Sequence, residues 1–146
     1  MSTNLQVEPL GPILTRTSRA VGMMLQRMFA REGYSMSSEQ WAVCANLYLR
    51  QNGQFQQQLA DRLYKDKAAI TRLVHGLERR GLVRREEDRD DRRQKKIFLT
   101  AKGEALMQQL FPIAARAQKQ GQKDIAPGDL AVFNRVLEHI YANANE

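Results

Sequence analysis

The chain of 146 residues has few of the residues that mark secreted or metal-binding proteins. Its one cysteine, Cys44, excludes a disulfide within the chain and fits a reducing cytoplasm. Its two histidines, His75 and His139, lie far from each other and from Cys44 in the sequence, so no local metal-ligand spacing is present. We therefore expect no metal, no other cofactor and a cytoplasmic location.

Long apolar runs are also missing. No stretch approaches the roughly 18 apolar residues of a membrane-spanning helix. The opening MSTNLQVEPLGP lacks a basic start followed by an apolar segment, so we do not expect a secretory signal. The glycines are scattered, the acids cluster in one run, and no nucleophile with its base or phosphate-cradling loop is visible. The sequence predicts neither a membrane protein nor an enzyme.

Positive charge is what the chain does have. Lys and Arg number 23 against 16 Asp and Glu, which gives a net charge of +7 and a pI of about 9.9. Residues 65–96 hold twelve of the basic and seven of the acidic side chains, so most of the excess lies there. A basic balance favours anionic partners, nucleic acid before acidic membranes, and a merely solvated surface is the alternative.

Apolar spacing of i, i+3, i+4 and i+7 predicts a mainly helical chain. The expected helices are residues 10–32, 37–50, 55–63, 66–80, 100–121 and a last one from 127. Ser37 with Gln40 has the form of a capping box, and Asp66 and Thr100 are expected N-caps. Pro112 is expected to kink the fifth helix.

The densely charged run RREEDRDDRRQKK (84–96) interrupts the helices. Residues 82–85 and 95–99 suit the two strands of a hairpin, and the run contains the turn between them. Two short helices joined by a tight turn and followed by a hairpin predict a winged helix-turn-helix. The predicted fold is mainly α with a small β-hairpin wing.

The outer face of helix 66–80 is predicted to read double-stranded DNA. Its small residues allow close approach, and its hydroxyl, guanidinium and imidazole groups can hydrogen-bond to base edges. Two lysines at the start of the helix are expected to meet phosphates. The residues concerned are Lys65, Lys67, Ala68, Thr71, Arg72 and His75. A solvated helix face is the alternative for this helix taken alone.

The hairpin tip is predicted to enter the minor groove through Arg89, Arg92 and Arg93, because negative potential is strongest where that groove is narrow. Aspartates alternate with these arginines and are expected to hold their side chains in place, which would reduce the entropy lost on docking. The aspartates are Asp88, Asp90 and Asp91.

Three segments resemble the MarR family of bacterial transcriptional regulators. They are MSSEQWAVCANL (36–47), QQLADRLYKDKAAITRLVHGLERRGLVRR (57–85) and DDRRQKKIFLTAKGEAL (90–106). The third matches the family's wing pattern, an acid, then D-x-R, then an apolar strand ending in L-T-x-x-G. The resemblance spans nearly the whole chain, because the first, fifth and sixth helices also have the expected order and length.

The resemblance implies one MarR-like domain over residues 1–146. A winged helix-turn-helix lobe would occupy 36–100, and a helical dimerisation region 5–35 and 101–146. It implies an obligate homodimer through the first, fifth and sixth helices that binds a palindromic operator, with repression favoured over activation. In many members a small aromatic or anionic effector releases the DNA.

The resemblance also carries over by position. The residues that match the groove-reading face are Ala68, Thr71, Arg72 and His75. Arg93 matches the wing-tip arginine, Asp91 the acid that braces it, and Thr100 the threonine that closes the wing. Phe55 and Ala126 depart from the pattern, since Thr or Ser is common at the start of the third and sixth helices.

Other interpretations remain open. A helical protein-interaction module that does not bind DNA would have a partner interface with little salt sensitivity. Redox regulation through Cys44 is another, although this residue lies on the inward stripe of its helix and is typical of an inert core thiol. Met23, Met24, Met28 and Trp41 are candidates to line an effector pocket, with a plain core role as the alternative.

Overall fold

The structure is a computed structural model, and it describes residues 9–146. The start of the predicted dimerisation region, residues 5–8, lies outside that range. The elements are α1 (Leu10–Arg31), α2 (Ser38–Leu49), β1 (Gln54–Phe55), α3 (Gln56–Arg62), α4 (Lys67–Arg79), β2 (Val83–Glu87), β3 (Lys95–Leu99), α5 (Ala101–Gly121) and α6 (Pro127–Ala144). The mainly helical fold with a small wing is confirmed.

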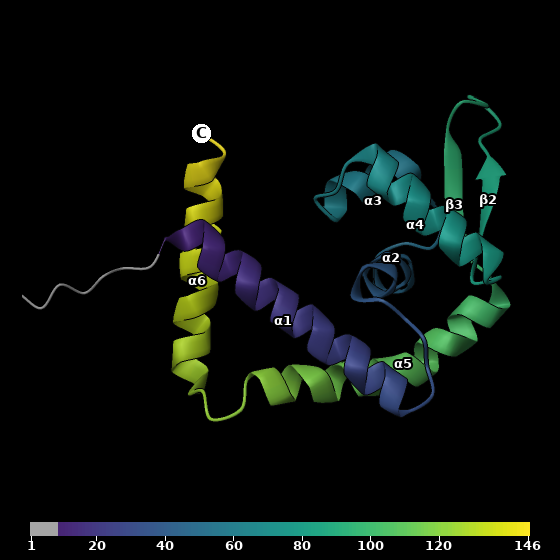
Figure 1. Cartoon of the computed structure of the whole chain (residues 1–146). Coiled ribbons are helices and arrows are strands. Elements are labelled where there is room, and N and C mark those ends of the chain that lie inside the picture. The colour runs from purple at the N-terminus through teal and green to yellow at the C-terminus, as the bar shows by residue number, and fades with distance from the viewer. Residues whose placement is uncertain (1–8) are drawn as a thin grey trace, which may run out of the picture.

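The elements form a lobe, with the long helices α1, α5 and α6 extending away from it (Figure 1). The lobe comprises α2, α3, α4 and the β2–β3 wing, which projects beyond the helices. Helix α1 packs along α5, and α6 stands apart at the far end. Helix α5 continues through Pro112, and its axis bends in Figure 1, as expected where a proline removes a backbone hydrogen bond.

The sheet has three antiparallel strands in the order β1-β3-β2, one more than the predicted hairpin. Val83 pairs with Leu99 at the base of the wing, and Phe55 of β1 pairs with Lys96 on the other edge of β3. The expectation that the third helix begins at Phe55 was therefore wrong by one residue. A strand of two residues carries no alternation that a sequence pattern could reveal.

The core lies inside the lobe and extends onto the adjoining ends of α1 and α5. Its largest members, contributed by six elements, are Phe29, Leu47, Leu59, Ile70, Leu77, Ile97, Met107, Leu110 and Ile113. On α2 the buried residues are Val43, Cys44 and Leu47, whereas Tyr48 is exposed. Trp41 is half-buried, and its ring lies between those of Phe29 and Phe111.

Local polar signals fix where the helices begin. Ser37 and Gln40 form the predicted capping box, with the Gln40 N–H donating to Ser37 Oγ at 3.0 Å. Asp66 Oδ1 accepts from the Ala69 N–H at 2.7 Å and so caps α4. Ala126 at the start of α6 makes no side-chain cap, as expected from its departure from the family pattern.

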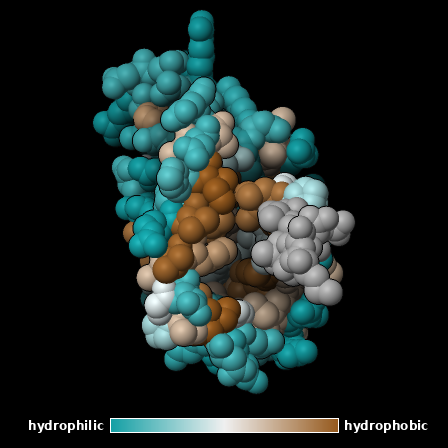
Figure 2. Space-filling view, turned by 90° about the vertical axis from the view of Figure 1, so that its left-hand side faces the viewer, coloured by the Kyte–Doolittle hydropathy of each residue, from teal (hydrophilic) through white to brown (hydrophobic). Residues whose placement is uncertain are grey.

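The far ends of α1 and α6 are largely exposed, and α6 meets the lobe through the ring of Tyr141, which lies 5.6 Å from that of Tyr64. None of the residues of α6 is buried, and the first three turns of α1 are exposed along their whole circumference. The exposed large apolar side chains at this end include Leu10, Ile13, Leu14, Val21, Met23, Val132, Phe133, Val136 and Tyr141. Figure 2 shows a continuous hydrophobic band over this end of the molecule.

Candidate nucleic-acid interface

Helix α4 is anchored by one face and presents the other to solvent. Ile70, Val74 and Leu77 are fully buried, which orients the helix. Of the residues predicted to read DNA, Thr71 is half-buried, and the exposed ones are Lys67, Ala68, Arg72 and His75. The structure therefore brings the predicted reading residues of this helix onto one accessible face, as their spacing requires.

The turn between α3 and α4 is tight. Tyr64 has a φ of +53°, which is the left-handed conformation, and its ring lies 5.6 Å from that of Tyr141 on α6. Lys65 follows, half-buried, with its Nζ 3.8 Å from a carboxylate oxygen of Glu39 at the start of α2. The lysine predicted to meet phosphate thus already has an acidic neighbour in the lobe.

Arg85 joins the wing to α4, a role that the sequence did not reveal. Its Nε and Nη2 donate to the two carboxylate oxygens of Glu78 at 3.1 and 2.9 Å. The hydrogen bond from Arg85 lowers the pKa of Glu78 below its ordinary value of 4.5. This fork-to-fork contact sets the orientation of β2 relative to the recognition face, because planar guanidinium and carboxylate groups must lie edge to edge.

Two further basic side chains of the wing strands, those of Arg84 and Lys96, lie against aromatic rings. The Arg84 guanidinium lies 4.5 Å from the centre of the Phe98 ring and pairs with Glu86. Lys96 Nζ lies 5.1 Å from the centre of the Phe55 ring. These contacts tie both sides of the sheet to aromatic rings, so the basic groups near the wing base stabilise the wing itself.

The wing tip differs in one respect from the prediction. Asp91 Oδ1 accepts from the backbone N–H of Arg93 at 3.0 Å, and its carbonyl accepts from the Gln94 N–H at 3.0 Å. Within residues 9–146, no ion pair joins the tip aspartates to Arg89, Arg92 or Arg93. Asp91 thus holds the turn backbone, not an arginine side chain, because a short side chain reaches its own turn first.

The three tip arginines are exposed, as is Arg72 on α4. Asp90 and Asp91 are exposed as well, and Asp88 is half-buried. The tip therefore presents guanidinium groups on a hydrogen-bonded turn that no core packing restrains. That arrangement can follow a phosphate backbone or a groove.

The wing closes on α5 through the L-T-x-x-G segment. Thr100 Oγ1 accepts from the Gly103 N–H at 3.0 Å and donates to the Gly81 carbonyl at 2.6 Å, and the Thr100 N–H donates to the Leu82 carbonyl. A Cβ on Gly103 would lie 2.2 Å from the Leu82 oxygen. The glycine is therefore required by the close approach of α5 to the start of β2.

Polar side chains that the sequence did not single out hold the loop before α3. The buried Gln54 donates through Nε2 to Asn46 Oδ1 at 3.0 Å and to the Gln51 carbonyl at 2.8 Å. Asn52 Oδ1 accepts from the Leu99 N–H at 2.8 Å. Amides in a loop give no periodic signal, so only the folded chain reveals that they connect α2 to β3.

Cys44 is inaccessible. It is 1% exposed, and burial raises the pKa of its thiol to about 12. A thiol that stays protonated at neutral pH is a poor nucleophile. Among the described residues, no group of three or more His, Cys, Asp and Glu side chains is arranged to hold a metal ion, and no helix is long and apolar enough to cross a membrane.

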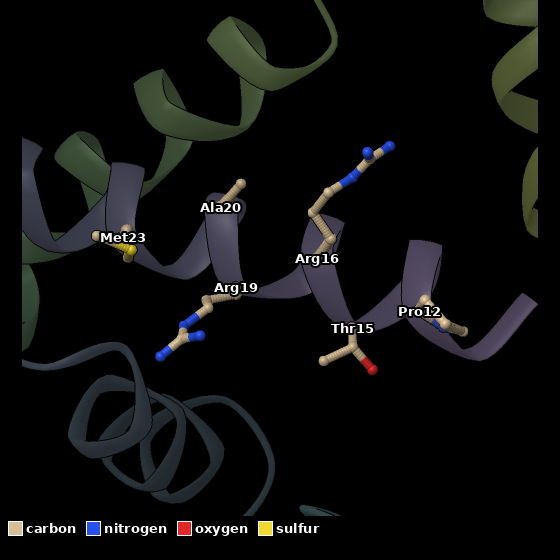
Figure 3. Close-up of a pocket in the computed structure, with 6 residues that line it drawn as sticks. All are labelled: Pro12, Thr15, Arg16, Arg19, Ala20 and Met23. Carbon is tan, nitrogen blue, oxygen red and sulfur yellow. The ribbon is translucent and has the colours of Figure 1, made fainter.

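A hollow of about 580 Å³ lies along α1, lined by Pro12, Thr15, Arg16, Arg19, Ala20 and Met23. Figure 3 shows Arg16 and Arg19 leaving the helix in opposite directions. Of the four residues predicted to line an effector pocket, Met23 alone is in this set. Trp41 belongs to the aromatic core instead.

Comparisons with known proteins agree with this geometry. The MarR family model matches residues 34–94. The solved structure of transcriptional regulator PA3341 is 33% identical, with a TM-score of 0.79 over 94% of this chain and 98% of its own. The transcriptional regulator HosA of Escherichia coli O157:H7 is 43% identical over 47 residues, which are 32% of this chain and 35% of HosA.

A mutant MarR from E. coli, solved in complex with operator DNA, has a TM-score of 0.83 at 19% identity over 92% of this chain and 95% of its own. At that identity the match speaks for the fold. Together with the family model and the 33% identical regulator, it identifies the class, a winged helix-turn-helix protein. The chain belongs to the MarR family of transcriptional regulators.

Proposed function

We propose that this protein is a sequence-specific double-stranded DNA-binding regulator that acts as a homodimer on a palindromic operator, represses transcription, and is released by a small ligand. The observation that carries the proposal is the exposed face of α4 beside a projecting wing with three exposed arginines. The Arg85–Glu78 contact joins the base of the wing to α4. A helix of this kind fits the major groove while the wing follows the adjacent backbone or minor groove.

The uncovered apolar face supports the homodimer. Helix α6 has no buried residue, and its exposed apolar side chains include Val132, Phe133, Val136 and Tyr141, a grouping that marks an interaction surface. A second copy of the same face would bury it symmetrically. Two copies related by a twofold axis carry two α4 helices, which is the arrangement that a palindromic operator matches. The E. coli MarR mutant with operator DNA supports the same reading by analogy of fold.

The hollow on α1 supports ligand release. Arg19 among its lining residues favours an anion, and the aliphatic lining favours a ring or short chain beside it. We expect a simple aromatic carboxylate such as benzoate to raise Tm of the wild type and to weaken its DNA binding. Arg19→Ala should reduce both effects. Equal effects on the two proteins would place the ligand elsewhere.

The test is a gel-shift titration against the DNA that flanks the protein's own gene, at low and moderate salt. Wild type should prefer this DNA over random duplex, and its affinity should fall steeply with salt because counterions are released. Arg93→Ala should weaken binding by about tenfold. Arg31→Ala is the matched control, because it removes the same charge from an exposed position at the end of α1, away from the wing.

Loss of affinity in both variants would mean that only net charge matters. No preference over random DNA, at any salt concentration, would favour the protein-interaction module. A genome-wide selection of bound fragments then separates that result from an operator that lies far from the gene.

A further inference from the structure

The hydroxyl of Thr71, in the middle of the recognition face, is already occupied. It donates to the Lys67 carbonyl one turn earlier at 2.9 Å, and its oxygen accepts from Nε2 of Gln56. A hydroxyl has a single hydrogen, so Thr71 cannot also donate to a base edge without giving up its bond to the helix backbone. What it offers a base is its methyl group, which suits the C5-methyl of thymine.

Gln56 comes to the same place from another element. It is the first residue of α3, and its side chain bridges to α4, fifteen residues further along the chain. Because Thr71 already donates its hydrogen, the bond requires the NH₂ end of the Gln56 amide to face Thr71. One N–H of this half-buried side chain is used, and no described contact engages the second N–H or Oε1.

The backbone that carries Gln56 is well fixed. The preceding Phe55 N–H donates to Gln58 Oε1 at 2.8 Å, and Phe55 pairs with Lys96 in the sheet. Both contacts restrain the first turn of α3. An amide that is held at its base and retains one donor and one acceptor is preorganised for a two-point contact.

We propose that Gln56 is a second base-reading residue, on α3, which together with Thr71 specifies adjacent A·T pairs in each half-site. The free N–H and Oε1 of Gln56 match N7 and N6 of adenine, the pair of groups that glutamine reads in the major groove. The Thr71 methyl contacts a neighbouring thymine methyl, and the Thr71 hydroxyl positions the Gln56 amide. This inference rests on the proposed DNA-binding function.

Two substitutions at Thr71 separate its two roles. Thr71→Ser keeps the hydroxyl that positions Gln56 and removes the methyl, so the adenine preference should remain and the thymine preference should fall. Thr71→Val keeps a methyl and removes the hydroxyl, so the thymine preference should remain and the adenine preference should fall. If Thr71 had a purely structural role, both variants would change the affinity, and neither would lose one base preference while keeping the other.

The experiment is selection from a random-sequence duplex library by wild type, both Thr71 variants and Gln56→Ala. Gln56→Ala should lower the preference at one adenine per half-site by about tenfold and leave the other positions unchanged. Gln57→Ala is the control, because that neighbouring glutamine is exposed and bonds to Asp61 within α3. It should select the wild-type sequence.

If Gln56→Ala lost affinity equally for all sequences and selected an unchanged motif, the inference would be overturned, because that is the result expected from a contact to phosphate. No change at all would overturn it as well. If the wild type itself selects no motif, the proposed function has failed and the inference with it. That outcome is read from the wild-type arm alone, so the two failures are distinguishable.

Discussion

Burial decides what Cys44 can do. Its thiol lies in the core, and the loss of solvation that raises its pKa also denies oxidants access. We expect no reaction with a thiol reagent in the native protein and full reaction in urea. Cys44→Ser should lower the free energy of unfolding by about 1–3 kcal/mol, because it buries a hydroxyl that has no hydrogen-bond partner. It should leave DNA binding unchanged.

The matched variant is Cys44→Ala, which removes the sulfur and adds no polar group. Both variants should respond to peroxide as the wild type does. If peroxide released DNA from the wild type and not from Cys44→Ser, redox regulation would be the correct interpretation after all.

The Arg85–Glu78 contact predicts a pH effect. The pKa of Glu78 is lowered by its hydrogen bond from Arg85, so the contact stabilises the protein above the ordinary value of 4.5 and is lost as pH falls through the lowered value. Glu78→Gln should be less stable than wild type at neutral pH and nearly equal to it at an acid pH below the lowered pKa of Glu78. Because the pair is partly exposed, the difference should stay below about 1 kcal/mol.

Urea unfolding of both proteins at the two pH values measures this difference. Arg89→Gln serves as the control, because it removes an exposed charge from the wing tip and is not among the groups that lower the pKa of Glu78. A gap between wild type and Glu78→Gln that persisted unchanged in acid would mean that the carboxylate charge is not the cause.

At the scale of elements, the junction of the wing with α5 is the most constrained place. A Cβ on Gly103 would meet the Leu82 carbonyl oxygen, which belongs to the backbone and cannot rotate away. Gly103→Ala should therefore destabilise the protein by about 1–3 kcal/mol, as overpacking does, and should weaken DNA binding because the base of the wing must shift.

Gly121→Ala on the same helix is the control. Its Cβ would meet Met24 Cε at 3.5 Å, an ordinary contact, and its φ is not left-handed. Alanine should raise stability there by about 0.5–1 kcal/mol. Thermal unfolding of the two variants should shift in opposite directions, and a gain in both would show that helix propensity, not the junction, dominates.

The elements also show which signals are local. Ser37, Asp66 and Thr100 were predicted as caps from neighbouring residues alone, and each makes its bond in the structure. On α2 no single stripe is buried, because four elements, α1, α4, α5 and β3, pack around that helix and its apolar residues do not lie on one side. Strand β1 exists only through its pairing with β3.

At the scale of the whole molecule, the apolar face of α6 predicts the assembly. Phe133 is 52% exposed and Val136 is 47% exposed, although both are apolar. Phe133→Asp would place a charge in the proposed dimer interface, so we expect light scattering to report a monomer. Affinity for a full palindrome should fall by about a hundredfold, because the second half-site no longer binds intramolecularly.

Ala131→Asp introduces the same charge on the opposite side of α6 and should stay dimeric. A monomeric wild type would contradict the proposal directly. A dimeric Phe133→Asp with unchanged DNA affinity would move the interface to another surface.

By itself, the sequence determined the order of the helices, their caps, the position of the wing and the face of α4 that meets solvent. Those features depend on periodicity and on contacts between residues close in the chain. The tertiary structure alone decided that Arg85 spans to Glu78 and that Gln56 reaches Thr71. These are choices among several charged or amide side chains of equal chemistry, and only the packing of one element against another selects which pair meets.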